Sequence, residues 1–414
     1  MKAKLALIFS VALSTLFVVQ ISARHDRQEC TTLVAAGGAT RSGAPLLWKN
    51  RDTDTLSNKV VFVDEQPYRY LALVNAEDTA GRIAWAGLNA AGFAVANSVA
   101  YNLPQIAGEE EDLEGHLMAD ALRTCRTVAD FERLLERHAN RNLGARANFL
   151  VVDAAGGASI FEAHNHGFKR LDASAFPGER IANTNFARSG TEHAGAGYLR
   201  FDREVALLDG LGARRLDAGT VLQVLSRDLG HALLSHPARA DWAKLPAGRP
   251  YWIHTNYTIN RASTASAIVI EGVRQGEDPR YATMWVVLGE PVTSIAVPLW
   301  VEAGVPPDPL WQGTDAPIAA EAFRLKDLLR PLRTRERREY ADVTRLDNAD
   351  GTGWLPATLA VEREIIAGAE RLLKTNPPAD AMAAFEKEAA EQALAALTAA
   401  GRGRYPSPNS SSLR

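Results

Sequence analysis

The sequence predicts an α+β protein in which packed β-sheets are flanked by helices and followed by a helical C-terminal region. Short apolar runs separated by Gly- and Asp-rich turns fill the chain from residue 30 to about residue 100, a pattern typical of antiparallel strands. Helical periodicity then alternates with a second group of strand-like runs. Two β regions that alternate with helices favour packed sheets with helices on the outside.

The individual elements follow from local composition. The predicted strands are Thr31 to Ala36, Ala44 to Asn50, Lys59 to Val63, Tyr70 to Asn75, Ile83 to Leu88, Phe93 to Ser98, Ala147 to Asp153, Ala158 to Ala163, Gly167 to Asp172, Thr264 to Val273 and Met284 to Val287. The predicted helices are Leu113 to Arg126, Val128 to His138, Tyr198 to Leu211, Ala218 to Leu229, Ala319 to Arg333, Thr358 to Thr375 and Asp380 to Ala399.

The N-terminal residues predict an export signal. A short basic start precedes the apolar run Leu5 to Ile21, and Ser22 and Ala23 are small residues suited to a signal peptidase. We interpret residues 1–23 as a signal peptide, with a retained membrane anchor as the alternative, and residues 24–29 as a short pro-segment. Residues 30–305 would form the core, 306–400 a helical C-terminal region and 401–414 a disordered tail. The protein is therefore expected in the periplasm or outside the cell.

Composition excludes several function classes. A net charge of -3 and a pI of about 6.3 give no basis for nucleic-acid binding. Once the leader is removed, we expect no stable membrane insertion, and the basic stretch Arg330 to Arg338 is interpreted as a solvated helix face. The chain contains no P-loop, dinucleotide fingerprint or metal-ligand cysteine spacing, and His164 and His166 are assigned to a loop. No cofactor is expected.

Cys30 and Cys125 are the two cysteines of the chain, too few for a disulfide framework. Cys125 lies in an amphipathic helical pattern that indicates packing, although a bridge between the two is the alternative. Cleavage before Cys30 would give one residue both a thiol and a free α-amine, whose reference pKa of about 7.7–8.0 suits a general base. In the uncut chain that nitrogen is a non-basic amide, so processing would activate the enzyme.

Hairpin pairing brings charged residues near Cys30. With Gly37 to Gly43 as the turn, Cys30 is predicted opposite Asn50, and both Lys49 and Asp52 lie close to it. Residues three apart face opposite sides of a regular strand, so we expect the strand to end or bulge around Asn50 and Arg51.

At this point the motifs resemble a known family. The segments Cys-Thr-Thr from Cys30, Leu-Trp-Lys-Asn-Arg-Asp ending at Asp52 and Trp-Ala-Gly-Leu-Asn-Ala-Ala-Gly-Phe-Ala from Trp85 are similar to the cysteine branch of the N-terminal nucleophile (Ntn) hydrolases, which includes choloylglycine hydrolases, penicillin V acylases and isopenicillin N acyltransferase-like proteins. The resemblance implies a four-layer αββα sandwich. It also implies an autocatalytically processed amidase or acyltransferase that cleaves a linear amide of an N-acyl compound through a cysteine thioester.

The resemblance carries residue roles with it. It implies Cys30 as nucleophile and Asp52 as the carboxylate near its amine, and Lys49 stands where the bile-salt branch has arginine. In the segment Ile181 to Phe186, Asn185 matches the oxyanion-hole donor, with Asn183 as the competing position.

Two further residues complete the implied site. Arg200 matches a later arginine motif that braces the nucleophile region, and Asn97 is expected to line the pocket. A cysteine Ntn dipeptidase and a non-catalytic secreted binding protein stay open as alternative functions. The expected partner is a small-molecule N-acyl amide whose acyl and amine groups the sequence does not specify, and it also leaves open whether the chain forms a homo-oligomer.

Overall fold

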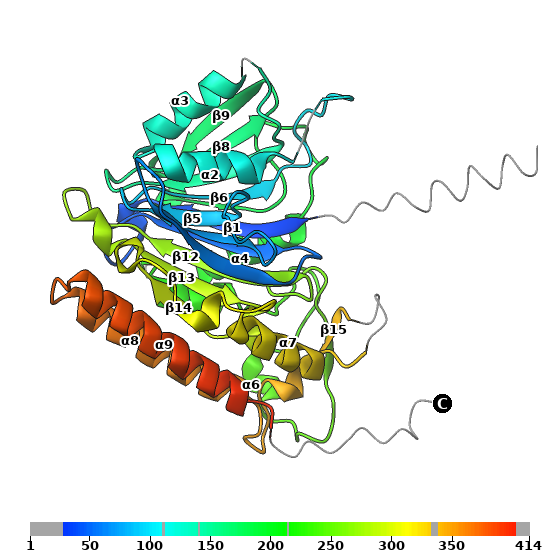
Figure 1. Ribbon diagram of the computed structural model, residues 1–414. Coiled ribbons are helices and arrows are strands. Elements are labelled where there is room, and N and C mark those ends of the chain that lie inside the picture. Colours follow the sequence, from blue (N-terminus) through cyan, green and yellow to red (C-terminus); the bar gives the residue numbers. More distant parts are fainter. Residues whose placement is uncertain (1–27, 110–111, 140, 213–214, 333–337, 403–414) are drawn as a thin grey trace, which may run out of the picture.

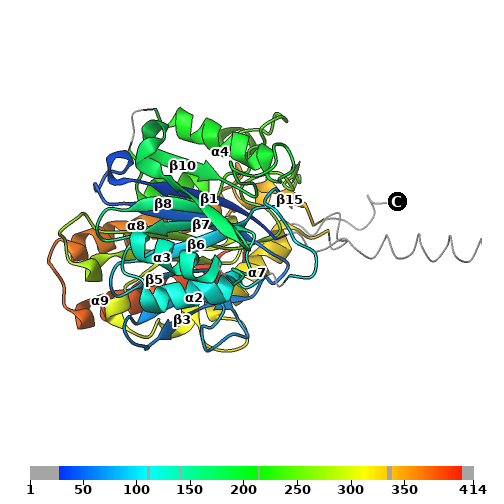
Figure 2. The same cartoon turned by 90° about the horizontal axis from the view of Figure 1, so that it is seen from above.

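The chain folds into stacked layers, with two β-sheets face to face and helices on both outer surfaces (Figures 1 and 2). The computed structural model describes residues 28–109, 112–139, 141–212, 215–332 and 338–402. The predicted signal peptide, residues 24–27 of the predicted pro-segment and residues 403–414 of the predicted C-terminal tail lie outside these ranges. The layer order is helix, sheet, sheet, helix, which confirms the predicted four-layer α+β class.

The first sheet carries the candidate nucleophile on one of its inner strands. Its six strands lie in the order β10-β1-β2-β12-β13-β14, all antiparallel. Their bounds are β1 Glu29–Ala35, β2 Leu46–Asp52, β10 Arg180–Asn183, β12 Thr264–Glu271, β13 Thr283–Leu288 and β14 Val297–Leu299. Strands far apart in sequence therefore meet at β1 and β2.

The second sheet is an antiparallel meander of seven strands that follow one another in the chain. Their bounds are β3 Asn58–Val63, β4 Tyr70–Asn75, β5 Ala86–Asn89, β6 Ala94–Val99, β7 Ala147–Val152, β8 Ala158–His164 and β9 Gly167–Asp172. Helices α2 (Glu114–Thr124) and α3 (Val128–Ala139) cover its outer face, as Figure 1 shows.

Alternation along the strands divides the apolar residues between two cores. On β4, Leu71 and Leu73 belong to the core between the sheets, whereas Tyr70, Ala72 and Val74 face α2 and α3. This period of two is what a strand buried on both faces requires, because successive side chains point to opposite sides. The sheet is thus held on one face by the other sheet and on the other face by helices.

The C-terminal helices form the fourth layer and pack directly on the first sheet. They are α7 (Pro317–Leu329), α8 (Leu355–Leu373) and α9 (Ala379–Ala399). Buried residues of all three helices belong to the same apolar core as the sheet. The backbone N–H of Trp300, next to β14, donates to buried Glu386 of α9 at 2.6 Å. This region is therefore continuous with the core that precedes residue 306.

Some sequence predictions need correction here. The helix expected at Ala218 to Leu229 is a short α5 (Ala218–Thr220) followed by a π-helical turn that ends at Leu225. Arg330 was expected on a solvated face, yet it is buried and paired with Glu290 at 2.7 Å. The remaining elements are α4 (Tyr198–Gly210), α6 (Arg239–Trp242) and the two-stranded sheet of β11 (Trp252–His254) and β15 (Tyr340–Asp342).

Within the described ranges, no helix is long and apolar enough to cross a membrane.

Candidate active site

Pairing of β1 with β2 brings Cys30 beside two cationic residues. The register places Glu29 opposite Asp52, Cys30 opposite Arg51 and Thr31 opposite Asn50. The predicted pairing of Cys30 with Asn50 is wrong by one residue. The reason lies in the connection, because the chain turns through a 3₁₀ segment and resumes pairing only at the second strand's first residue, Leu46.

The corrected register decides which side chains share a face with the sulfur. Directly opposed residues of an antiparallel pair point to the same side, so Cys30 shares its face with Arg51 and with Lys49. Asp52 lies on the other face. The bulge expected around Asn50 and Arg51 is also wrong, since β2 pairs regularly to Asp52, and the irregularity falls instead on the neighbouring strand between Thr264 and Ser266.

On the sulfur's face, Lys49 is held by uncharged acceptors. Its Nζ donates to Asn97 Oδ1 at 2.7 Å and to the carbonyl of Trp85 at 2.9 Å. The guanidinium of Arg51 lies over the Trp85 ring at 4.4 Å from its centroid. Burial lowers the pKa of Lys49 to about 8 and that of Arg51 to about 10, and the charge of Cys30 opposes both shifts. Two cations thus face the thiol, and the predicted pocket residue Asn97 joins them.

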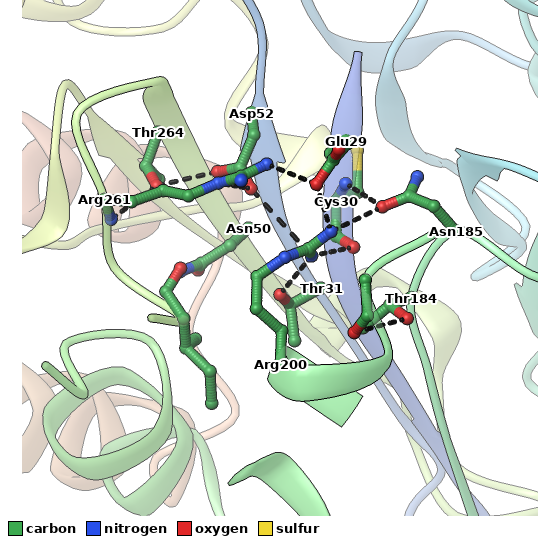
Figure 3. A network of polar contacts seen from close by, with 12 residues as sticks. Glu29, Cys30, Thr31, Asn50, Asp52, Thr184, Asn185, Arg200, Arg261 and Thr264 are labelled. Carbon is green, nitrogen blue, oxygen red and sulfur yellow. Dashed lines mark hydrogen bonds and ion pairs between the residues drawn. The ribbon is translucent and has the colours of Figure 1, made fainter. Parts of the chain in front are cut away.

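On the opposite face, Asp52 is the centre of a buried polar cluster (Figure 3). Its carboxylate accepts from Arg261 Nε at 2.7 Å and from Thr264 Oγ1 at 2.7 Å, and Arg200 Nη1 lies 4.0 Å away. Asp52 and Arg200 are each 1% exposed. Charges so deeply buried are stable only when paired and hydrogen-bonded. The aspartate is therefore fixed between two guanidiniums.

Arg200 reaches this cluster from the first turn of α4. Its Nη1 donates to the carbonyl of Cys30 at 2.6 Å and to Thr31 Oγ1 at 2.9 Å, and its Nη2 donates to Asn185 Oδ1 at 2.8 Å. The same guanidinium therefore joins β1, at Cys30 and Thr31, to the segment that carries Asn185. Figure 3 shows the side chain rising from α4 toward β1.

Asn185 holds the backbone nitrogen of Cys30. Its Oδ1 accepts from that N–H at 2.9 Å, while its Nδ2 donates to the carbonyl of Val99 at 3.1 Å. Both ends of the amide are engaged, so its role as an oxyanion donor stays a prediction. Asn183, the last residue of β10, lies opposite Thr32 of β1, and its side chain accepts a long hydrogen bond from Arg188 at 3.4 Å. Of the two asparagines, Asn185 is the one that contacts Cys30.

Residues upstream of Cys30 occupy the site. The Glu29 carboxylate accepts from Arg200 Nη2 at 2.7 Å and from Arg261 Nη2 at 3.0 Å. Burial raises the pKa of this carboxyl, but the Arg261 and Arg200 guanidiniums outweigh it and hold the pKa below its ordinary value. The hydroxyl of Tyr101 donates to the carbonyl of Gln28 at 2.6 Å. Cys30 is consequently only 5% exposed.

Sequence reasoning missed four participants, namely Glu29, Arg51, Arg261 and Thr264. The segment Lys-Asn-Arg-Asp carried a signal for Arg51, because a strand that presents Lys49 also presents the residue two positions later. Glu29 and Arg261 lay outside every quoted motif. Their roles depend on chain segments that come together only in the folded protein.

Other features of the described chain take no part in the contacts that hold Cys30. Cys30 and Cys125 are both free thiols, so the alternative disulfide is not formed, and burial raises the pKa of Cys125 to about 12. A cavity of about 280 Å³ lies between α8 and α9, and one of about 190 Å³ lies beside Lys326 of α7. The described residues contain no group of three or more His, Cys, Asp or Glu side chains able to hold a metal ion.

The solved structures to which the chain is similar include proteins from three organisms. A variant of conjugated bile acid hydrolase from Clostridium perfringens is 11% identical with a TM-score of 0.39, covering 65% of this chain and 92% of that one. An N-acylethanolamine-hydrolyzing acid amidase ortholog from Caenorhabditis elegans is 15% identical with a TM-score of 0.38, and the match covers 58% of this chain and 92% of that one. Penicillin V acylase from Agrobacterium tumefaciens is 16% identical with a TM-score of 0.36, and the match covers 66% of this chain and 86% of that one. No curated protein sequence matches the chain.

A family model gives the more informative comparison. The model of acyl-coenzyme A:6-aminopenicillanic acid acyl-transferase matches residues 39–204. This range contains Lys49, Asp52, Asn97, Asn185 and Arg200, which the fold brings together around Cys30. The match confirms the resemblance to the cysteine Ntn hydrolases over this part of the chain and supports an enzyme of the amidase and acyltransferase class.

Proposed function

We propose that the protein is an exported zymogen whose cleavage between Glu29 and Cys30 exposes an N-terminal cysteine nucleophile. The mature enzyme would cleave a linear amide bond of an N-acyl compound through a thioester on Cys30. Export is supported by the apolar run Leu5 to Ile21, which lies outside the described residues. The partner is a small N-acyl amide.

The observation that carries this proposal is the set of contacts around one peptide bond. Asn185 accepts from the nitrogen of Cys30, Arg200 donates to the carbonyl of Cys30, and both Arg200 and Arg261 bind the side chain of Glu29. Packing alone does not require four buried charges at a strand end, since buried ion pairs add little net stability. A site that must handle the Glu29–Cys30 bond accounts for them.

Cleavage would convert the Cys30 nitrogen from an amide into an amine. Asn185 Oδ1 already accepts a hydrogen bond from this atom and would orient the amine afterwards. Arg200 and Arg261 lie close by with only Asp52 left to balance them once Glu29 departs. Nearby positive charge disfavours a protonated amine. The amine would therefore be held in the form that can take the proton of the thiol.

The other face of β1 supplies what the sulfur needs. A thiolate is the reactive form of cysteine, and nearby cations favour it. Lys49 and Arg51 provide those cations, and burial strengthens their interaction with the sulfur because little water screens it. Base and cations thus approach the same residue from opposite sides of the strand.

The reaction then proceeds in two steps. The sulfur attacks the acyl carbonyl, the bond from carbonyl carbon to nitrogen breaks, and the α-ammonium returns its proton to the leaving amine. Water activated by the same amine hydrolyses the thioester and restores the thiol. Asn185 remains the predicted oxyanion donor, although its nitrogen donates to the carbonyl of Val99 in the uncut chain. We propose the amide nitrogen of Asn97 as a second donor, because Lys49 fixes the oxygen end of that side chain and no hydrogen bond within the described chain engages its nitrogen.

A pair of cysteine variants tests the proposal. Cys30→Ala should remain uncut, hydrolyse no N-acyl amide and form no acyl adduct. Cys125→Ala removes the other buried thiol, which packs against α2 and α3, and should keep both processing and turnover. N-terminal sequencing, intact mass and amide hydrolysis are the measurements. Turnover by Cys30→Ala, or an active wild-type protein that still carries Glu29, would refute the assignment.

A further inference from the structure

Glu29 fills a charged niche that processing would empty. Two guanidinium groups converge on one of its carboxylate oxygens, Arg200 at 2.7 Å and Arg261 at 3.0 Å. Both arginines are almost completely buried, and each is fixed by further bonds, Arg200 to Thr31 and Arg261 to Asp52. Rigid, buried guanidinium groups are the usual means by which proteins recognise a carboxylate. The niche is therefore a built anion site, at present occupied by the chain itself.

The charges of the cluster balance only while Glu29 is present. Arg200 and Arg261 carry two positive charges, and Asp52 and Glu29 carry two negative charges. Removal of Glu29 leaves one buried positive charge without a partner. Since uncompensated buried charge is unfavourable, the processed site attracts a replacement anion.

Processing and turnover pass through the same kind of intermediate. In self-cleavage, the Cys30 sulfur attacks the carbonyl carbon of Glu29, the peptide C–N bond breaks, and the nitrogen takes up the thiol proton and becomes the α-amine. Water then hydrolyses the thioester to a Glu29 carboxylate and a free thiol. In turnover, the acyl group of a substrate is bonded to the same sulfur. Its carbonyl therefore takes the place that the carbonyl of Glu29 held.

We infer that the mature enzyme prefers acyl groups that end in a carboxylate, with Arg200 and Arg261 as the residues that bind it. The carbon chain between carbonyl and side-chain carboxylate of Glu29 has the length of a glutaryl group, so glutaryl amides are the class that fits. This inference rests on the proposed function, because it uses the thioester on Cys30. Arg200 and Arg261 become specificity-determining residues of the reaction.

Matched substrates test the inference on the processed wild-type enzyme. We would compare p-nitroanilides of glutaric acid, of pentanoic acid and of the glutaric monoamide, which have similar length but differ in terminal charge. Sites that bind a polar group strongly reject analogues without it. We expect kcat/KM for the glutaryl compound to exceed both others by about 100-fold or more, mainly through KM. Equal or faster turnover of the pentanoyl compound would overturn the inference and leave the proposed function standing.

A binding experiment gives an answer that does not depend on turnover. Alkylation of Cys30 by iodoacetamide would be followed in the presence of glutaramate or the uncharged diamide glutaramide, and of the peptide of residues 24–29 or the same peptide with Glu29→Gln. Glutaramate and the native peptide should slow the alkylation, whereas glutaramide and the Glu29→Gln peptide, which lack the carboxylate that the arginines bind, should not. Equal protection within each pair would contradict the anion site. Failure of the proposed function looks different, because Cys30 would then form no thioester with any acyl donor.

A variant assigns the preference to the arginines. In Arg261→Gln, the ratio of glutaryl to pentanoyl turnover should fall at least ten-fold. Both rates are measured in one variant, so a general loss of activity cancels in the ratio. An unchanged ratio would exclude Arg261 as the carboxylate-binding residue.

Discussion

Replacement of Lys49 by methionine separates the catalytic value of this lysine from its effect on stability. Burial lowers the pKa of Lys49 from 10.5 to about 8, and each pKa unit corresponds to about 1.4 kcal/mol, so the charged form destabilises the fold by about 3 kcal/mol. Methionine removes that penalty but leaves the acceptors on Asn97 and Trp85 without a donor, at about 1–3 kcal/mol each. The two effects oppose each other and are similar in size. We therefore expect the free energy of unfolding at pH 7 to change little.

The same shift predicts how stability depends on pH. Because the folded pKa of Lys49 lies below the unfolded one, the unfolded chain binds more protons between about pH 8 and 10.5, and stability rises with pH in this window. Denaturant unfolding across the window should show a smaller rise for Lys49→Met than for the wild-type protein. A rise of the same size in both proteins would refute the electrostatic argument.

Activity should respond quite differently from stability. Lys49→Met removes a cation that favours the thiolate, so alkylation of Cys30 near neutral pH should slow about ten-fold or more, and amide hydrolysis with it. Lys326→Met is the matched control, because burial lowers the pKa of this lysine also to about 8 while its Nζ lies 3.9 Å from Glu290. The control should leave alkylation of Cys30 unchanged. Equal alkylation rates in Lys49→Met and the wild-type protein would show that Lys49 does not activate the thiol.

Three further outcomes follow from the buried charges. Arg227 donates two hydrogen bonds to the buried carboxylate of Glu362, at 2.7 and 2.9 Å. Glu362→Gln breaks this ion pair and should lower the free energy of unfolding by about 3–5 kcal/mol. Glu364→Gln, at an exposed position of the same helix, is the control and should change the free energy of unfolding by less than about 0.5 kcal/mol. Asp52→Asn should strongly reduce both processing and hydrolysis, measured by intact mass and turnover on protein shown to be folded by circular dichroism. It should also lower the free energy of unfolding, because two buried guanidiniums lose their partner. A fully active variant would contradict the role proposed for Asp52 beside the amine. In the uncut Cys30→Ala protein, the lowered pKa of Glu29 means that its contribution to stability is present above about pH 4.5 and is lost as the pH falls below that value. When the free energy of unfolding is measured at falling pH, it should therefore decrease less in the same protein with Glu29→Gln.

The sequence was sufficient for the elements that have a strong period or a clear boundary. The strands of the meander and the three C-terminal helices lie within a few residues of the predicted bounds, because alternation and helical spacing are local signals. Short strands such as β11 and β15 escaped prediction. These two strands pair with each other across a long sequence separation, and the residues within each short segment show no pattern that predicts a strand.

The predicted site residues lie near one another, but their catalytic roles stay predictions. Asn185 and Arg200 contact the backbone of Cys30, Lys49 binds Asn97 on the sulfur's face, and Asp52 lies beside Arg200. The register was wrong because loop length does not fix pairing when a 3₁₀ turn intervenes.

Burial misled the interpretation of charges. The basic stretch from Arg330 was interpreted as solvated because lysine and arginine side chains usually are. Arg330 instead binds the buried carboxylate of Glu290, which also accepts a hydrogen bond from Asn260. Arg261 was overlooked for a related reason. A single arginine in a loop has no local signature, and its value comes from Asp52 and Glu29, which are distant in sequence.

The most direct test is mass spectrometry of the active wild-type protein after brief reaction with an N-acyl amide. If the account is right, the N-terminal peptide begins at Cys30 and carries the acyl group on that residue's sulfur, and the adduct disappears at the rate of turnover. An active protein whose first residue precedes Cys30, or turnover without any acyl group on that sulfur, would contradict the central claim.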